Sequence, residues 1–159
     1  MQTQCPTRKN LKRHQNRLER DFPSFQFTVT TGEQIEPRHM REIIAVNRLR
    51  MAEKGKVARF DETRVDWIID LARQRGMMTL VRIDGRICAG AGTLRLGYTL
   101  VSHVNAHDPL YNDYRMGMLC CFMTICAGIE PGAKRFDFLC AATNTRPPCS
   151  ASTRGFSAT

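Results

Sequence analysis

The chain has 159 residues, 42% of them hydrophobic and 25% charged, which suits one globular domain that can bury a real core. Its formal net charge of +9 is concentrated in residues 8–20, and the remainder is only mildly basic. No charged segment followed by an apolar stretch and a small-residue cleavage site opens the chain, which argues against a signal peptide and favours the cytoplasm. The most apolar stretch, residues 116–129, is shorter than the roughly 20 residues of a membrane-spanning helix, so we expect a buried helix and no membrane span.

The seven cysteines form no CxxC pair and no Cys/His spacing typical of zinc, so no metal site is predicted. Their odd number, without a secretion signal, argues for free thiols. Cys120, Cys121 and Cys126 fall in the apolar stretch, where cysteine acts as a small hydrophobe.

The first predicted element is a basic helix over residues 9–20, which Pro23 ends. Its only regular apolar positions are Leu11 and Leu18, so we expect a solvated helix or a frayed arm. Residues 25–30 then alternate apolar and polar side chains, which predicts a half-buried strand closed by Gly32.

Two helices are predicted next, without a strand between them. The first begins near Glu36, with Pro37 in its first turn, and ends at Gly55. The second begins at a plausible N-cap, Asp61, and ends at Gly76. Its apolar stripe faces the core and consists of Val65, Ile68, Ile69 and Ala72.

An antiparallel meander follows, because Asp84 and Gly85 form a hairpin turn between the apolar residues 78–81 and 87–93. The apolar phase shifts by one residue after this, which indicates a bulge beside Gly92. Residues 98–106 form the third strand of the meander. A loop leads to the helix over residues 116–129, and residues 135–139 make a short buried strand.

The predicted order is therefore β-α-α-β-β-β-α-β, an α/β (α+β) fold with a mixed, mostly antiparallel sheet flanked by helices. We divide the chain into a basic helix or arm at 1–21, a domain at 22–139, and a tail at 140–159. The tail has almost no large apolar residues, so we expect it to be disordered and to add no core strand.

The informative sequence is His-Val-Asn-Ala-His-Asp-Pro-Leu-Tyr-Asn-Asp-Tyr-Arg-Met-Gly-Met-Leu at 103–119, with Lys-Arg-Phe-Asp-Phe-Leu at 134–139. Gly117 lies near the first turn of the apolar helix and lets the backbone approach a ligand closely. The free N–H groups of residues 115–119 and the helix dipole favour a pyrophosphate, and Arg115 adds a fork-shaped donor.

These segments resemble the GNAT-superfamily acetyltransferase domain of the cellulose-biosynthesis proteins called CelD, where a D-P-x-Y/F loop, a Gly-opened apolar helix and an F-D-F-L strand follow one another. The resemblance implies an acyl-CoA-dependent N-acyltransferase linked to bacterial cellulose or exopolysaccharide biosynthesis. It implies acetyl-CoA or another acyl-CoA as co-substrate and a small-molecule or sugar-amine acceptor. The implied cofactor-binding residues are Ser102, His103, Val104, Asn105, Arg115, Met116, Gly117 and Met118. The usual loop has the form Q/R-x-x-G-x-G/A, whereas here residues 115–118 hold one Gly at compressed spacing.

In such enzymes the acceptor amine attacks the thioester directly, so catalysis needs positioning and proton removal. We consider His103, His107 and Asp108 as the base, although His103, in a strand, is more typical of a structural histidine. Asp137 is a further catalytic candidate, because a carboxylate between two Phe must be hydrogen-bonded or protonated if it is buried. His107 and Asp108 can also simply shape the turn, and Asp137 can lie on the polar face of its strand. Tyr111 and Tyr114 can line the acyl or acceptor pocket, or pack the loop on the sheet.

The segment after Leu139 departs from the resembled family, which continues with G-x-x-x-Y-K and further sheet. One choice of codons for Cys140 onward, translated from the third base, gives R-G-N-E-Y-K, so we expect a frameshift near codon 140 and a loss of activity with it. Residues 8–20 resemble the middle of the family's longer proteins, so we expect Met1 to be an internal start.

A second hypothesis is a basic protein without catalytic activity that binds nucleic acid or an anionic surface through residues 8–20. The basic stretch lacks the interleaved aromatic residues of a single-strand binder, so nucleic acid ranks as the less favoured partner.

Overall fold

The computed structural model describes residues 8–57, 61–138 and 150–152, and it confirms the predicted fold class. The helices are α1 (Arg8–Asp21), α2 (Pro37–Glu53), α3 (Glu62–Arg75) and α4 (Met116–Ile129), with short 3-10 segments η1 (Gly32–Gln34) and η2 (Pro109–Tyr114). The strands are β1 (Gln26–Thr31), β2 (Gly76–Ile83), β3 (Arg86–Leu96), β4 (Thr99–His107), β5 (Arg135–Phe138) and β6 (Ser150–Ser152).

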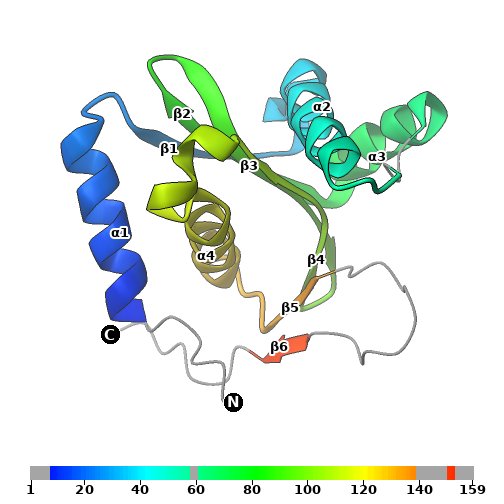
Figure 1. The fold of residues 1–159 in the computed structure, drawn as a ribbon. Helices are drawn as coiled ribbons and strands as arrows, with labels where there is room; N and C mark the ends of the chain where they lie inside the picture. Colours follow the sequence, from blue (N-terminus) through cyan, green and yellow to red (C-terminus); the bar gives the residue numbers. More distant parts are fainter. Residues whose placement is uncertain (1–7, 58–60, 139–149, 153–159) are drawn as a thin grey trace.

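The six strands form one sheet in sequence order, β1 to β6 (Figure 1). Every neighbouring pair is antiparallel except β4 and β5, which are parallel because α4 crosses over between them. Helices α2 and α3 cover one face of the sheet, and α1 and α4 lie on the other (Figure 1).

Local sequence signals account for the ends of α3 and for the β2–β3 hairpin. The side chain of Asp61 accepts a hydrogen bond from the N–H of Arg64 at 2.8 Å, so Asp61 is the N-cap that the sequence predicts. In the hairpin, Asp84 and Gly85 have φ angles of 52° and 77°, which two-residue turns between right-twisted strands require.

Two apolar cores form, one on each face of the sheet. The α2/α3 side includes the predicted stripe residues Val65, Ile69 and Ala72, packed with Met40, Ile43, Ile44, Met78, Leu80, Val104 and Ala106. The α1/α4 side contains Leu18, Val81, Ile83, Cys88, Ala89, Ala91, Met116, Leu119, Cys120 and Met123. Strand residues alternate between these cores, as the period of two predicts.

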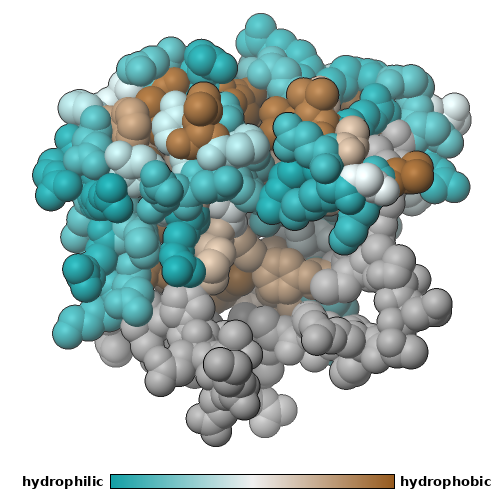
Figure 2. All heavy atoms as spheres, viewed as in Figure 1, coloured by the Kyte–Doolittle hydropathy of each residue, from teal (hydrophilic) through white to brown (hydrophobic). Residues whose placement is uncertain are grey.

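Helix α1 is docked on the domain, so the expectation of a solvated helix or frayed arm is wrong. Leu18 is fully buried and Leu11 is 7% exposed. The two leucines are seven residues apart, which places them on one stripe of the helix, and this stripe faces α4. The outer surface of α1 is hydrophilic, as the left side of Figure 2 shows.

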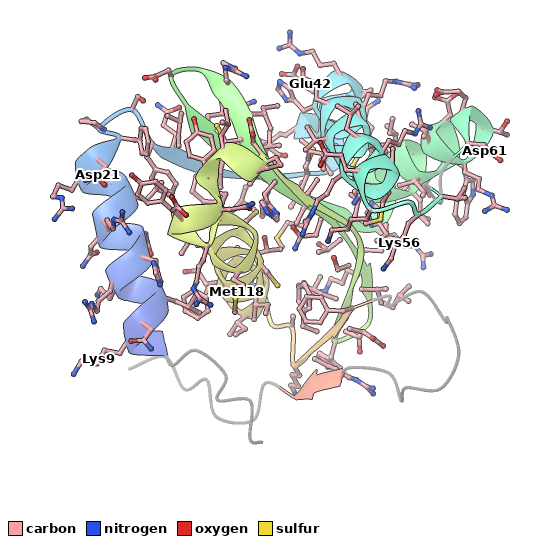
Figure 3. All side chains as sticks on the ribbon, viewed as in Figure 1. Lys9, Asp21, Glu42, Lys56, Asp61 and Met118 are labelled. Carbon is pink, nitrogen blue, oxygen red and sulfur yellow. The ribbon has the colours of Figure 1, made fainter. Side chains whose placement is uncertain are left out.

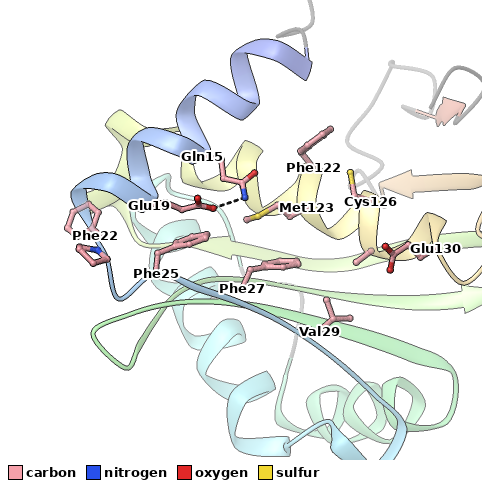
Figure 4. A pocket seen from close by; sticks show the side chains of 12 residues that line it. Gln15, Glu19, Phe22, Phe25, Phe27, Val29, Phe122, Met123, Cys126 and Glu130 are labelled. Atoms are coloured by element: carbon pink, nitrogen blue, oxygen red, sulfur yellow. Dashed lines mark hydrogen bonds between the residues drawn. The ribbon is translucent and has the colours of Figure 1, made fainter. Parts of the chain in front are cut away.

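A groove of about 770 Å³ remains between α1, β1 and α4 (Figure 4). Phe25 and Phe27 line it from β1, and Phe122 and Met123 line it from α4. Gln15 and Glu19 of α1 are hydrogen-bonded to each other along its edge, at 2.9 Å.

Part of the tail differs from expectation. Ser150–Ser152 form β6, an edge strand antiparallel to β5, where the tail was expected to be disordered. Pairing of this kind uses backbone groups, so it does not need the large apolar side chains that the tail lacks. The remaining residues of 140–159, including the region of the expected frameshift, lie outside the described residues. Within the described part of the chain, no helix is long and apolar enough to cross a membrane.

Candidate functional site

A β-bulge in β4 is the first feature of the candidate site. Gly92 pairs with Val104 and Thr93 pairs with Ser102, so His103 is an extra residue in β4. This confirms the predicted bulge beside Gly92, with the inserted residue in the partner strand. The bulge also switches the buried face of β4: Leu100 packs near α4, whereas Val104 and Ala106 pack against α2 and α3.

Strand β4 loses its β5 neighbour at this bulge. The parallel pairing joins Thr99–Ser102 to Arg135–Phe138 and goes no further, although β4 continues to His107 beside β3. Among the described strands, none pairs with 103–107 on the β5 side. This backbone therefore offers peptide groups to an extended ligand, over the stretch where the sequence predicts contacts from His103 to Asn105.

Both ring nitrogens of the half-buried His103 are buried without a partner among the described residues. Neither ring nitrogen has a hydrogen bond within the described structure, and burial lowers the pKa of the imidazole to about 4. A Cβ on Gly92 would lie 2.7 Å from its Nε2 atom, so glycine at 92 leaves space for the ring. Ser102 is buried and Asn105 is half-buried in the same strand.

Helix α4 starts directly beyond this strand. Arg115 has left-handed backbone angles (φ 52°, ψ 43°), and it is the N-cap without a side-chain cap hydrogen bond. Leu119 donates its N–H to the Arg115 carbonyl, which leaves the N–H groups of the first turn, Met116 to Met118, without helical acceptors. Arg115 and Met118 are exposed, whereas Met116 is fully buried.

Gly117 makes a contact that the sequence did not predict. A Cβ at this position would lie 2.6 Å from Nδ1 of His107, so the imidazole, from the end of β4, occupies the space that the missing side chain leaves. The approach of a ligand to the backbone of Gly117 stays a prediction.

His107 joins three elements at the end of β4. Its Nδ1 lies 3.0 Å from Nη1 of Arg50 on α2, and its Nε2 lies 3.0 Å from Oδ1 of Asn112 in η2. Because a guanidinium only donates, Nδ1 accepts and the proton is on Nε2, which donates to Asn112. Burial and the positive charge of Arg50 lower the pKa of His107, which favours this neutral form.

The other two predicted catalytic residues, Asp108 and Asp137, lie in different settings. Asp108 caps η2, since its Oδ1 accepts the N–H of Leu110 at 3.0 Å, and this contact shapes the turn. Asp137 is half-buried in β5 and pairs in register with Val101, six residues before His107, or about 20 Å along β4. The structure therefore brings His107 and Asp108 together and holds Asp137 apart, near the bulge.

Asn47 and Arg50 of α2 were not predicted from the sequence. Asn47 donates to the carbonyl of Asn105 at 3.2 Å, and Arg50 bonds to His107, so one turn of α2 contacts the open end of β4. No motif marks either residue, because both contacts join segments more than 50 residues apart.

The two loop tyrosines pack toward α1. Tyr111 and Tyr114 make edge contacts with Phe22 at ring distances of 5.5 and 5.4 Å. The hydroxyl of Tyr114 donates to Asp21 at the end of α1, the residue labelled in Figure 3. These contacts favour the interpretation in which the tyrosines pack the loop.

Cys88, Cys120 and Cys121 are free thiols. Burial raises the pKa of Cys120 to about 12 and that of Cys121 to about 11, so both stay protonated and act as small apolar side chains of α4.

Comparison with known proteins places this geometry in a family. No curated protein sequence matches the chain. Among solved structures, an acetyltransferase from Streptococcus agalactiae is similar at 14% identity and a TM-score of 0.56, over 74% of this chain and 73% of that one. The ribosomal-protein-S18-alanine N-acetyltransferase from Escherichia coli is similar at 15% identity and a TM-score of 0.53, over 76% and 70%. An aminoglycoside 6'-N-acetyltransferase complexed with coenzyme A matches at 8% identity and a TM-score of 0.52, over 70% and 60%.

These structural likenesses concern the fold, and the family model is the stronger finding. The model described as the acetyltransferase (GNAT) domain matches residues 6–145, which is most of the chain. The chain therefore belongs to the GNAT acetyltransferase domain family.

Proposed function

We propose that this protein binds acyl-CoA, with acetyl-CoA as the first candidate, and transfers the acyl group to the amine of a small molecule in the cytoplasm. The observation that carries the proposal is that three features follow one another along the chain. They are the bulge at His103, the end of β4 without a β5 neighbour, and the start of α4 without a side-chain cap. Family membership supports the same chemistry.

The donor groups suit the parts of a coenzyme A ester. The N–H groups of Met116, Gly117 and Met118, with the positive end of the α4 dipole and the exposed Arg115, fit a diphosphate. The peptide groups of 102–105 fit an amide-containing arm and the thioester carbonyl. When bound, the coenzyme supplies the activated acyl group.

Transfer forms a C–N bond between the acceptor amine and the acyl carbon and breaks the C–S bond; the amine proton goes to a base, and coenzyme A leaves as a thiolate that takes up a proton. Of the predicted catalytic residues, His107 uses both ring nitrogens in hydrogen bonds, and Asp108 uses Oδ1 to cap η2. This favours a positioning role for both: His107 ties α2 and η2 to the end of β4, and Asp108 fixes the turn. Asp137, beside the bulge, is then the candidate for proton removal.

The finer parts of the proposal concern the acceptor and the level of activity. From the CelD-like segments we propose a sugar amine of cellulose or exopolysaccharide biosynthesis as the acceptor. The printed sequence lacks the Y-K segment after Leu139, so we propose that transfer is weak even where acyl-CoA binds. The aminoglycoside 6'-N-acetyltransferase, which has an amino-sugar acceptor by its name, is consistent with such an acceptor class.

Isothermal titration with acetyl-CoA tests the binding part. Met118 is 42% exposed in the first turn of α4, and Met118→Asp places a negative charge where the diphosphate is proposed to bind. We expect affinity to fall at least about tenfold. Leu49→Asp, at a 69% exposed position on α2, is the matched control and should bind like the wild type. Equal affinities for all three proteins, or no binding by the wild type, would contradict the proposal.

The second candidate function, binding of nucleic acid through α1, rests on the exposed Lys9, Lys12 and Arg13. Arg17 and Arg20 contribute less, since both pair with Asp21. A triple change of Lys9, Lys12 and Arg13 to Glu leaves the buried Leu11 and Leu18 in place. Salt-sensitive binding of DNA or RNA that this variant loses would support the candidate, and unchanged binding would exclude α1 as its site.

A further inference from the structure

A second hollow lies at the other end of the sheet, where β4 begins. Its volume is about 490 Å³. Residues from five neighbouring segments line it: Thr31, Gly32, Arg73, Gln74, Arg75, Gly76, Met77, Arg95, Gly97, Leu100, Gly128 and Pro131. Leu100 is seven residues before His107 on β4, so the hollow is about 20 Å from the start of α4. It is separate from the proposed diphosphate site at the start of α4.

The charged residues that line this hollow are all arginines, namely Arg73, Arg75 and Arg95. Arg95 is held in place: its Nε donates to the carbonyl of Gly97 at 3.1 Å and its Nη2 to that of Pro131 at 2.9 Å. Arg73 donates through Nη2 to Glu33, whose side chain is 92% exposed. The Nε of Arg73 is buried and has no hydrogen-bond partner in the described structure.

Helix ends explain part of this arrangement but not all of it. Helices α3 and α4 both end beside the hollow, and basic residues there offset the negative ends of the helix dipoles. Each helix end carries roughly half a negative charge and Glu33 carries one more, so three guanidinium groups leave an excess of roughly one positive charge. The helix dipoles also do not account for the Nε of Arg73, because a buried donor without a hydrogen-bond partner costs free energy.

The rest of the lining restricts the ligand. Met77 and Leu100 are buried apolar residues with exposures of 5% and 4%, and they give the hollow an apolar wall. Gly32, Gly76, Gly97 and Gly128 contribute backbone without side chains. Guanidinium forks match the geometry of phosphate and carboxylate groups. We propose that this arginine pocket, with Arg73 and Arg95 as its principal donors, binds a small molecule that joins a phosphate or carboxylate to a short apolar body.

Titration calorimetry on the full chain tests the pocket, with phenyl phosphate and inorganic phosphate as probes. We expect phenyl phosphate to bind more tightly, because its ring contacts Met77 and Leu100. Arg73→Gln should weaken phenyl phosphate binding about tenfold. Glu33→Gln should strengthen it about threefold, because the competing carboxylate is removed. Arg64→Gln, a charge loss on the same helix outside the pocket, is the matched control and should bind like the wild type.

Three results would overturn the proposal: equal affinity for both probes, equal losses in Arg64→Gln and Arg73→Gln, or no effect of Glu33→Gln. The Glu33 variant decides the matter alone if Arg73→Gln fails to fold, which circular dichroism reports. Met118→Asp separates the two anion sites. Unchanged phenyl phosphate affinity in that variant places the probe in the arginine pocket, and lost affinity places it at α4 and overturns the inference.

Discussion

The two ring nitrogens of His103 are buried and have no hydrogen-bond partners among the described residues. Burial holds its pKa at about 4, below the value near 6.5 of an exposed histidine. Between these two pKa values the unfolded chain binds more protons than the folded one. The free energy of unfolding is therefore unaffected by His103 above pH 6.5, and it falls as the pH drops toward 4. The loss from this residue is about 3 kcal/mol.

The variant His103→Leu isolates this contribution from that of the carboxylates, which also titrate at low pH. We measure the free energy of unfolding with urea at pH 7 and at pH 4. Between these pH values we expect it to fall by about 3 kcal/mol less in His103→Leu than in the wild type. If the free energy of unfolding of His103→Leu falls with pH as much as that of the wild type, the imidazole is protonated in the folded wild-type protein at low pH without a cost in stability.

Gly117 offers a second test at the residue scale. Alanine is favoured over glycine inside a helix by about 1 kcal/mol, so propensity alone predicts that Gly117→Ala stabilises α4. The contact with His107 predicts the reverse, because the new Cβ would lie 2.6 Å from Nδ1. We expect a net loss of about 1–3 kcal/mol by chemical denaturation.

The double variant Gly117→Ala with His107→Ala separates the two effects. Removing the imidazole should relieve the clash, so the alanine at 117 should cost nothing or stabilise in that background. If Gly117→Ala costs the same with and without His107, the contact is not the reason for the glycine.

At the scale of elements, α1 determines whether the basic segment is part of the domain. Leu18 is fully buried against α4, so Leu18→Ala should lower the unfolding free energy by about 2–4 kcal/mol. Leu49→Ala, at a 69% exposed position, is the control and should change it by less than about 0.5 kcal/mol. Small effects for both variants would restore the picture of α1 as a solvated arm.

The elements differ in how far the sequence specifies them. Helix α3 has a cap, an apolar stripe and a stop signal within one window, and all three agree with the structure. Two leucines seven residues apart in α1 are compatible with a free or a docked helix, because docking depends on α4, a hundred residues away. The register shift lies beside Gly92 as predicted, but its extra residue, His103, is in the partner strand β4, so the bulge changes which face the residues of β4 present.

The parts of the candidate site that come from one continuous segment could be predicted from the sequence, and the parts that tertiary packing brings together could not. The backbone of 102–105 and the start of α4 follow from one continuous segment. Asn47 and Arg50 reach that segment only through the packing of α2 on β4, for which no local pattern exists. The contact between Gly117 and His107 had the same limit, because His107 comes from the preceding strand.

At the scale of the whole molecule, the net charge of +9 attracts any polyanion, so binding of acetyl-CoA alone is weak evidence for a specific site. Stability gives a sharper measure, because a ligand that binds the folded state at a hundred times its Kd adds about 2.7 kcal/mol. For a domain of this size that corresponds to a rise in Tm of roughly 5–10 °C. We expect acetyl-CoA to produce this rise in the wild type and in Leu49→Asp, and a much smaller one in Met118→Asp.

ATP, a polyanion without the acyl-pantetheine arm, should produce a smaller rise in Tm. This rise should disappear at 0.5 M salt, because screening by the salt removes attraction at distances beyond about 5 Å. Equal rises with ATP and acetyl-CoA would assign the effect to net charge, whereas a salt-resistant rise with acetyl-CoA alone requires contacts along the unpaired end of β4.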